Sequence, residues 1–232
     1  MLPKILVGCP THEVKSYCLG LYAKAVKSLT YKNFDIALVD NSPTEDYAKR
    51  INSFGLKVIK GLYFDTAAER IITSRNILRD YALQNNYDYL LSLEQDNLPP
   101  PDVIERLLAH NKKIIAGVYF NLQKNLNGEV VPLAMLWTSI EGNTKFHLPE
   151  ELIFDKPGLY KVAGCALGCT LIARDVLEKI EFRHGKTLEE GWDDVFFSKD
   201  AAALGYEIFA DTSVFCQHAT TPEGKWVGIK KF

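Results

Sequence analysis

Two acidic residues, Glu94 and Asp96, directly follow an apolar run at residues 87–93. No Lys or Arg stands beside them, so a turn here would hold two negative charges close together. A divalent cation stabilises such a pair, because carboxylate oxygens are hard ligands. Prolines at 99–101 would stiffen the turn and open the helix that follows. Short acidic turns also occur without a ligand, and the motif alone leaves this alternative open.

Asp40 and Arg75 each permit a structural and a functional interpretation. Asp40 ends an apolar run and precedes Asn-Ser-Pro, which is favourable turn chemistry. A carboxylate there could also accept a hydrogen bond from a nucleobase or a ribose hydroxyl. Arg75 shares the apolar face of a predicted helix with Ile71 and Leu78. It could pair with a structural acid or extend along the apolar surface, or it could contact anionic groups of a ligand.

Asp193 and Asp194 open a predicted helix, and His218 ends a late strand. Acids at a helix N-terminus are favourable for capping and dipole reasons alone. In a cleft, the same position would hold a carboxylate ready to accept a proton as a general base. A single His is often a structural hydrogen-bonding group, but His218 is also a candidate metal ligand.

The elements that must position these residues alternate regularly in the first half of the chain. Strands without polar alternation, separated by helices, predict a mostly parallel sheet covered on both faces. Ligands of such sheets bind beyond the carboxyl ends of the strands, where the candidate residues fall. The predicted strands are 4–9, 35–40, 56–61, 87–93 and 112–120, and the predicted helices are 13–29, 44–54, 66–86 and 101–111.

After residue 120 the pattern is less regular. Residues 121–160 are expected to be loops around one strand, VVPLAMLW. The later elements are predicted as strands at 160–173, 206–211 and 214–218, with helices at 174–180 and 192–204. No repeat or linker composition marks a boundary. The sequence therefore predicts a single domain over 1–232, with 1–120 as a nucleotide-binding half and 121–232 as an acceptor-side half.

Composition limits the classes of partner. The 232 residues are 47% hydrophobic and 24% charged, with a formal net charge of −2. This charge gives no general attraction to nucleic acid or to anionic membranes. Neither a signal peptide nor an apolar run long enough for a membrane span is recognised, so a cytoplasmic protein is expected. The five cysteines are expected to be reduced and mostly buried.

Several motifs, taken in order, resemble the nucleotide-sugar-dependent glycosyltransferases of the GT-A fold, in particular the inverting family-2-like group. The motifs that carry the resemblance are CPTHE (9–13), LVDNSPTED (38–46), SRN (74–76), LEQDN (93–97), AGCALGC (163–169), GWDD (191–194) and the strand ending in His218. Three positions depart from the family pattern. His12 replaces an aromatic residue, Glu94 stands where Asp is usual, and Asp193 stands where Glu is usual.

The resemblance implies roles for individual residues. The nucleotide-sugar-binding set would be Pro10, Thr11, Glu13, Asp40, Arg75, Glu94, Gln95 and Asp96. Asp96 and His218 would bind Mn²⁺ or Mg²⁺, with Glu94 reaching the metal or the ribose through water. Asp194 would be the general base, with Asp193 as the alternative. The acceptor side would comprise Gly164, Cys165, Ala166 and Trp192.

The implied reaction moves a sugar from a nucleoside-diphosphate sugar to an acceptor hydroxyl with inversion. The acceptor would be a glycan, a lipid or a protein. One alternative is a non-catalytic nucleotide- or glycan-binding module of the same fold. Another is a sugar-1-phosphate nucleotidyltransferase, which would need a glycine-rich phosphate loop after the first strand. The sequence CPTHEVK (9–15) has no such loop.

Overall fold

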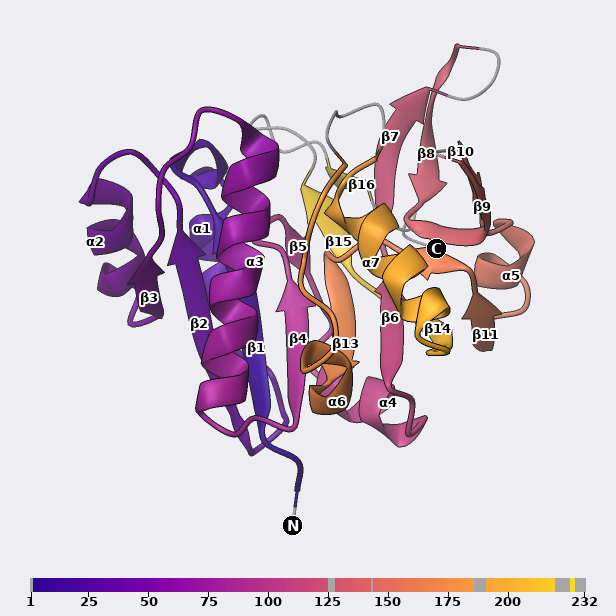
Figure 1. The fold of residues 1–232 in the computed structure, drawn as a ribbon, viewed down its shortest axis with the longest axis horizontal. Coiled ribbons are helices and arrows are strands. Elements are labelled where there is room, and N and C mark those ends of the chain that lie inside the picture. Colours follow the sequence, from indigo (N-terminus) through magenta and orange to yellow (C-terminus); the bar gives the residue numbers. More distant parts are fainter. Residues whose placement is uncertain (1, 125–127, 143, 186–190, 220–225, 228–232) are drawn as a thin grey trace.

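A central eight-stranded sheet organises the chain in the computed structural model, which describes residues 2–124, 128–142, 144–185, 191–219 and 226–227 (Figure 1). Its strand order is β11-β14-β6-β13-β4-β1-β2-β3. The strands are β1 (Ile5–Thr11), β2 (Phe34–Asp40), β3 (Lys57–Lys60), β4 (Tyr89–Leu93), β6 (Ile114–Val118), β11 (Leu159–Val162), β13 (Cys169–Ala173) and β14 (Ile208–Phe215).

Most strands of this sheet run in one direction. Strands β3, β2, β1 and β4 are parallel neighbours, and β6 is parallel to β14. Only β13, which lies between β4 and β6, and the edge strand β11 run the other way among the described strands of this sheet. The carboxyl ends of β1, β2 and β4 therefore meet at one edge, as the alternating sequence pattern predicted.

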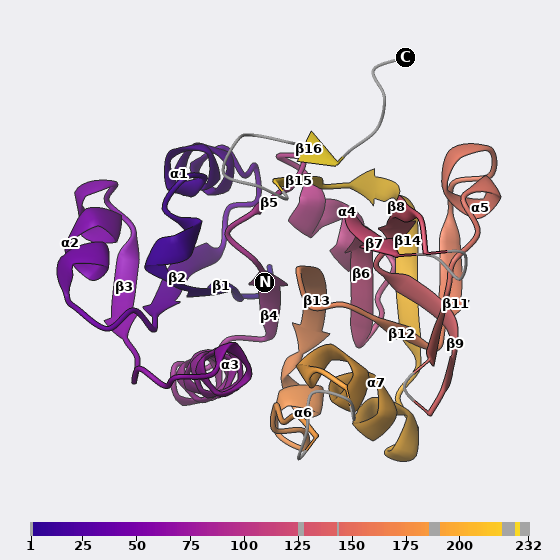
Figure 2. The ribbon, with the colours of Figure 1, turned by 90° about the horizontal axis from the view of Figure 1, so that it is seen from above.

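Helices cover both faces of the sheet (Figure 2). Each face has its own apolar core. One core includes Ile5 and Val7, and the other includes Leu6 between them, because successive side chains of a strand point to opposite faces. The first face carries α1 (Leu19–Lys27), α2 (Asp46–Ser53) and α4 (Val103–Ala109). The second carries α3 (Ala67–Gln84), α6 (Arg174–Leu177) and α7 (Asp193–Ala203).

The region 121–160 contains more regular structure than the predicted loops and single strand. The hairpin β7–β8 projects above the central sheet in Figure 1, and β9 pairs with both β10 and β12 in a separate small sheet. The bounds are β7 (Phe120–Lys124), β8 (Val130–Ala134), β9 (Leu136–Glu141), β10 (Thr144–His147), α5 (Glu151–Phe154) and β12 (Gly164–Cys165). Mixed polar and apolar residues conceal short strands of this kind from pattern analysis.

Two predicted elements are divided in the structure. The apolar run 160–173 forms β11, β12 and β13, because the chain leaves the central sheet at β12 and then returns to it. The predicted helix 13–29 is a 3-10 turn, η1 (Glu13–Lys15), followed by α1 from Leu19. The side chain of His12 caps η1, with Nδ1 accepting from the Val14 N–H at 3.2 Å. Lys15 consequently stays close to the end of β1.

A short strand pairing brings distant parts of the chain together beside the sheet edge. The strand β5 (Asn97–Leu98) pairs with β15 (Gln217–Ala219), and Asn97 stands opposite His218. Strand β16 (Trp226–Val227) completes this sheet. Because Asp96 directly precedes β5, the pairing sets Asp96 beside His218.

Membrane and thiol features can be stated for the described residues. Within them, no helix combines the length and apolar character that a membrane crossing requires. All five cysteines lie in the described part of the chain, where they are buried and free, as the sequence predicted.

Gly164 sets the close approach of α7 to the small sheet. A Cβ atom there would lie 2.7 Å from Ser198 Oγ and 2.8 Å from Trp137 Cε3. Overpacking of this kind costs about 1–3 kcal/mol, so Gly164→Ala is expected to lower the free energy of unfolding by that amount in urea denaturation. Gly20→Ala is the control, since its Cβ would meet Phe54 Cε1 at an ordinary 3.7 Å within a helix. Equal stability of the two variants would contradict the packing role.

Candidate functional site

Two adjoining cavities lie at the carboxyl edge of the sheet. The first, here called the acidic cavity, has a volume of about 370 Å³, and its walls include Arg75, Glu94, Asp96, Asp193, Asp194 and His218. The second, called the β1 cavity, has a volume of about 220 Å³, and its walls include Pro10, Thr11, His12, Asn41, Arg70 and Gln95. Lys15, Ile71, Glu94 and Asp96 line both. The cavities therefore meet at the acidic turn after β4.

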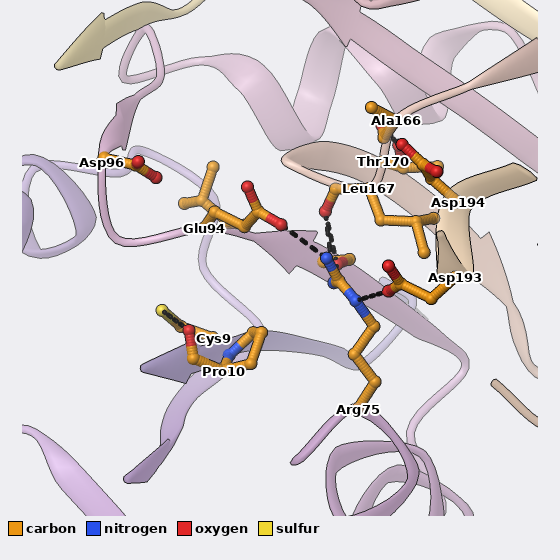
Figure 3. A network of polar contacts seen from close by, with 12 residues as sticks. Cys9, Pro10, Arg75, Glu94, Asp96, Ala166, Leu167, Thr170, Asp193 and Asp194 are labelled. Atoms are coloured by element: carbon orange, nitrogen blue, oxygen red, sulfur yellow. Dashed lines mark hydrogen bonds and ion pairs between the residues drawn. The ribbon is translucent and has the colours of Figure 1, made fainter. Parts of the chain in front are cut away.

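Arg75 joins three elements at the floor of the acidic cavity. Its Nε lies 2.5 Å from Asp193 Oδ2, and its Nη2 lies 2.5 Å from Glu94 Oε1 (Figure 3). Nη1 donates to Ser92 Oγ at 2.7 Å. The side chain is 4% exposed. Of the two interpretations of Arg75, the structure shows pairing with acids inside the protein, at a place where a ligand in the cavity would also meet it.

The paired acids of α7 have different surroundings. Asp193 is buried and bound to Arg75, whereas Asp194 lies above Asp193 and farther from Arg75 in the view of Figure 3. Burial raises the pKa of Asp194 to about 7, and the negative charge of Asp193 adds to this effect. The Val195 N–H donates to Asp194 Oδ1 at 2.7 Å, which orients the carboxylate. Asp194 can therefore exchange a proton near neutral pH.

Glu94 lies where both cavities meet. Burial raises its pKa, the guanidinium of Arg75 opposes that effect, and the charges of Asp96 and Asp193 reinforce it. Its side chain remains 30% exposed. The ion pair with Arg75 thus fixes one oxygen of Glu94.

Asp96 and His218 form a pair of potential metal ligands. His218 Nε2 lies 3.2 Å from Asp96 Oδ2, and Lys15 Nζ forms an ion pair with the same oxygen. Burial alone would raise the pKa of Asp96, but the hydrogen bonds and charges of His218 and Lys15 lower it to about 2. Asp96 is therefore a carboxylate at all physiological pH values.

The donor atoms of this pair suit a divalent cation. His218 Nδ1 lies 2.8 Å from the Phe120 carbonyl oxygen, which can only accept, so Nδ1 donates and Nε2 faces Asp96 Oδ2. Burial alone would lower the pKa of His218, but the hydrogen bond to Asp96 and the charge of Asp96 raise it, and an ion would bind Nε2 in place of its proton. Fixing one ring nitrogen in this way is typical of histidines that bind metals. In the described part of the chain, no cluster of three or more His, Cys, Asp or Glu residues could hold an ion. Two protein ligands leave open positions, which suits an ion also bound by phosphate oxygens.

Some of the predicted nucleotide-binding residues line the β1 cavity, whereas Asp40 does not. Thr11 and Gln95 line the β1 cavity and hydrogen-bond to each other, and Gln95 Oε1 also accepts from Tyr47 Oη at 2.8 Å. Asp40 is fully buried, 3.0 Å from Lys60 Nζ, and accepts from the Ser42 N–H at 2.9 Å. Its neighbour Asn41, rather than Asp40, lines the cavity. The predicted contact of Asp40 with a nucleobase stays a prediction.

Glu13 and two acceptor-side residues lie outside the cavity walls formed by the described residues. Glu13 is exposed on η1, where its backbone N–H donates to Ser42 Oγ at 2.8 Å. Gly164 and Cys165 are buried, and the Cys165 N–H donates to Ser198 Oγ at 3.4 Å. Gly164 and Cys165 thus pack against Ser198 of α7. Ala166 and Trp192, by contrast, line the acidic cavity.

Several wall residues were not predicted from the sequence. Tyr119 and Leu167 line the acidic cavity, Arg70 lines the β1 cavity, and Lys15 lines both. The ring of Tyr119 packs edge-on against His218 with centroids 5.3 Å apart. The position of Lys15, a basic residue shortly after the first strand, could have indicated a role at the carboxyl edge of the sheet. Tyr119 had none, because it lies within an apolar strand run.

Comparison with known proteins supports the fold. No family model matches the sequence, and no curated protein matches it significantly. The crystal structure of A197 from STIV is 17% identical, with a TM-score of 0.55 over 99% of this chain and 95% of its own. The crystal structure of GalNAc-T7 with UDP, GalNAc and Mn²⁺ is 13% identical, with a TM-score of 0.65 over 95% of this chain and 46% of its own. At these identities the likeness concerns the fold alone, and it supports a GT-A-like fold for this mixed α/β chain.

Proposed function

We propose that this chain is a metal-dependent, inverting glycosyltransferase that uses a nucleoside-diphosphate sugar. One observation carries the proposal: the two cavities meet at Glu94 and Asp96, and Asp194, an acid with a pKa of about 7, lines the acidic cavity. A donor spanning both cavities would leave its diphosphate at their junction. The likeness to a glycosyltransferase structure containing UDP and Mn²⁺ supports the same assignment.

The β1 cavity is the proposed site of the nucleoside. It combines apolar contacts from Val14 and Ile71 with polar groups from Asn41 and Arg70, as a planar base joined to a ribose requires. The Asn41 Oδ1 atom is buried and has no hydrogen-bond partner among the described residues, so it offers an acceptor to a ligand donor.

The junction is the proposed site of the diphosphate. Asp96 and His218 would hold Mn²⁺ or Mg²⁺, with imidazole favouring Mn²⁺. The bound ion would stabilise the negative charge of the leaving nucleoside diphosphate. Glu94 and Asp193, both fixed by Arg75, would face the sugar in the acidic cavity.

The reacting groups follow from this arrangement. The acceptor oxygen would attack the anomeric carbon while the bond from that carbon to the diphosphate oxygen breaks, and the bonding pair leaves with the diphosphate. Asp194 would take the proton of the acceptor hydroxyl. A single displacement inverts the anomeric configuration. Trp192, which is 39% exposed at the rim of the acidic cavity, would contact the acceptor.

Nucleotide affinity is expected to depend on the divalent ion through Asp96. Calorimetric titration of UDP, GDP and dTDP should show tighter binding of at least one of them with Mn²⁺. In Asp96→Asn this gain should fall at least about tenfold, the loss typical even for weaker perturbations of metal sites. Asp102→Asn, in the same turn region but 54% exposed, is the control and should retain the gain. Equal wild-type affinity with and without Mn²⁺ would refute metal dependence.

A further inference from the structure

We infer that Lys15 competes with the divalent ion for Asp96 and moves to the diphosphate when the ion binds. The inference rests on the proposed function, because it assumes an ion on Asp96 and a diphosphate beside it. It assigns Lys15 a positioning role that makes binding of the ion and of the nucleotide cooperative.

The first support is the shared oxygen. Lys15 Nζ and His218 Nε2 both contact Asp96 Oδ2. An ion held by this oxygen and by Nε2 would lie next to the lysine ammonium. Two cations that close together repel strongly in a largely buried site. Since the Asp96 side chain is only 6% exposed, water would screen this repulsion little. The ion and the ammonium therefore compete for Asp96.

The second support is the freedom of the Lys15 side chain. Its backbone is anchored, since the carbonyl oxygen accepts from Gln95 Nε2 at 2.6 Å. The side chain itself is 40% exposed. A lysine ammonium on a flexible four-carbon stem can change partners without moving the backbone. Lys15 can thus leave Asp96 while η1 stays in place.

The third support is the charge around the junction. Arg75, the arginine in the described wall of the acidic cavity, is bound to Glu94 and Asp193. Arg70 in the β1 cavity donates to the carbonyl oxygens of Phe64 and Asp65. Lys15 lines both cavities, so it is placed where a diphosphate bridging them would lie. The Lys15 ammonium is therefore the positive charge best placed to bind the phosphates.

A thermodynamic consequence follows. Without a nucleotide, the ion must displace Lys15 from Asp96, and this competition weakens the affinity of the protein for the ion. Once a diphosphate accepts the ammonium, this competition ends and the ion binds more tightly. Coupling between two ligands is reciprocal, so the ion must strengthen nucleotide binding by the same factor.

The test uses Mn²⁺ alone as the first probe. Free Mn²⁺ is measured by electron paramagnetic resonance during titration of the wild type, Lys15→Met and Lys15→Arg. Lys15→Met is expected to bind Mn²⁺ at least about fivefold tighter than the wild type, within the usual range of coupling factors. Lys15→Arg retains the charge and should resemble the wild type. Lys49→Met, which removes an exposed lysine on α2, is the matched control.

A second titration adds the nucleoside diphosphate. The factor by which it tightens Mn²⁺ binding should be smaller in Lys15→Met than in the wild type. Combining Lys15→Met with Asp96→Asn should abolish the gain in Mn²⁺ affinity, which places the ion on Asp96. Circular dichroism melts verify that each variant is folded.

Unchanged or weaker Mn²⁺ affinity in Lys15→Met would overturn the inference, as would absence of Mn²⁺ binding in every variant with and without nucleotide. A different result would contradict the proposed function while leaving the inference about Lys15 intact. If Mn²⁺ affinities change as expected but no nucleotide sugar is cleaved, Lys15 keeps its role in a binding protein and the glycosyltransferase assignment is wrong.

Discussion

Asp194→Asn is expected to slow glycosyl transfer roughly 10²–10⁴-fold, the usual loss when a general base is removed. The carboxylate lines the acidic cavity, and its pKa of about 7 suits proton transfer near neutral pH. Asn preserves the shape of the side chain and can still accept from the Val195 N–H. Transfer kinetics at saturating donor should therefore show a lower kcat with nearly unchanged donor affinity and melting temperature.

The pH profile gives an independent test of the same residue. A general base acts when deprotonated, so wild-type kcat should fall as the pH drops below about 7. This fall should disappear in Asp194→Asn. Asp193→Asn is the matched comparison, because it changes the neighbouring carboxylate that Arg75 already binds. If Asp193→Asn lost the chemistry and Asp194→Asn kept it, the base would be Asp193.

Arg75→Met is expected to lower the free energy of unfolding by about 3–5 kcal/mol, the usual cost of leaving buried charges unpaired. The side chain is 4% exposed, and it pairs with Asp193 at 8% and Glu94 at 30% exposure. Met fills a similar volume without the charge. Urea denaturation followed by circular dichroism measures the change.

Two further variants separate charge from packing at this position. Asp193→Asn combined with Arg75→Met should recover part of the lost stability, because one of the unpaired carboxylates is then absent. Lys113→Met, which removes an exposed ion pair with Asp175, should leave the denaturation midpoint nearly unchanged. A loss in Arg75→Met no larger than in Lys113→Met would mean that the Arg75 pairs contribute little to stability.

The fold was predictable in its regular half. Strands β1, β2 and β4 are apolar without alternation and end in recognisable polar groups, so both the sheet and the edge that carries the candidate site followed from the sequence. The acids of α7 were also recognisable in the sequence, because acidic residues often mark the start of a helix. Which of Asp193 and Asp194 would act as the base stays a prediction; among the described contacts, Arg75 binds Asp193.

The remainder depends on contacts between distant residues. Asp96 and His218 meet through β5, a two-residue strand too short to show periodicity. Asp40 permitted both a turn and a ligand-binding interpretation in the sequence, and only the structure shows that its carboxylate binds Lys60 and the Ser42 N–H of the turn. Lys15 was assigned to a helix, and only the 3-10 turn after His12 places it over Asp96. Such pairings arise from tertiary packing, which local patterns do not contain.

The central claim is tested most directly by incubating the protein with Mn²⁺, a panel of UDP-, GDP- and dTDP-sugars and mixed glycan, lipid and peptide acceptors, and identifying every product. We expect release of one nucleoside diphosphate with formation of a glycoside of inverted anomeric configuration, and strong loss of both in Asp194→Asn. Tight binding of a nucleotide sugar without turnover would instead indicate a binding module. With pyrophosphate added as the nucleotidyl acceptor, formation of a sugar 1-phosphate and a nucleoside triphosphate would indicate nucleotidyl transfer, and either result would contradict the proposed glycosyltransferase.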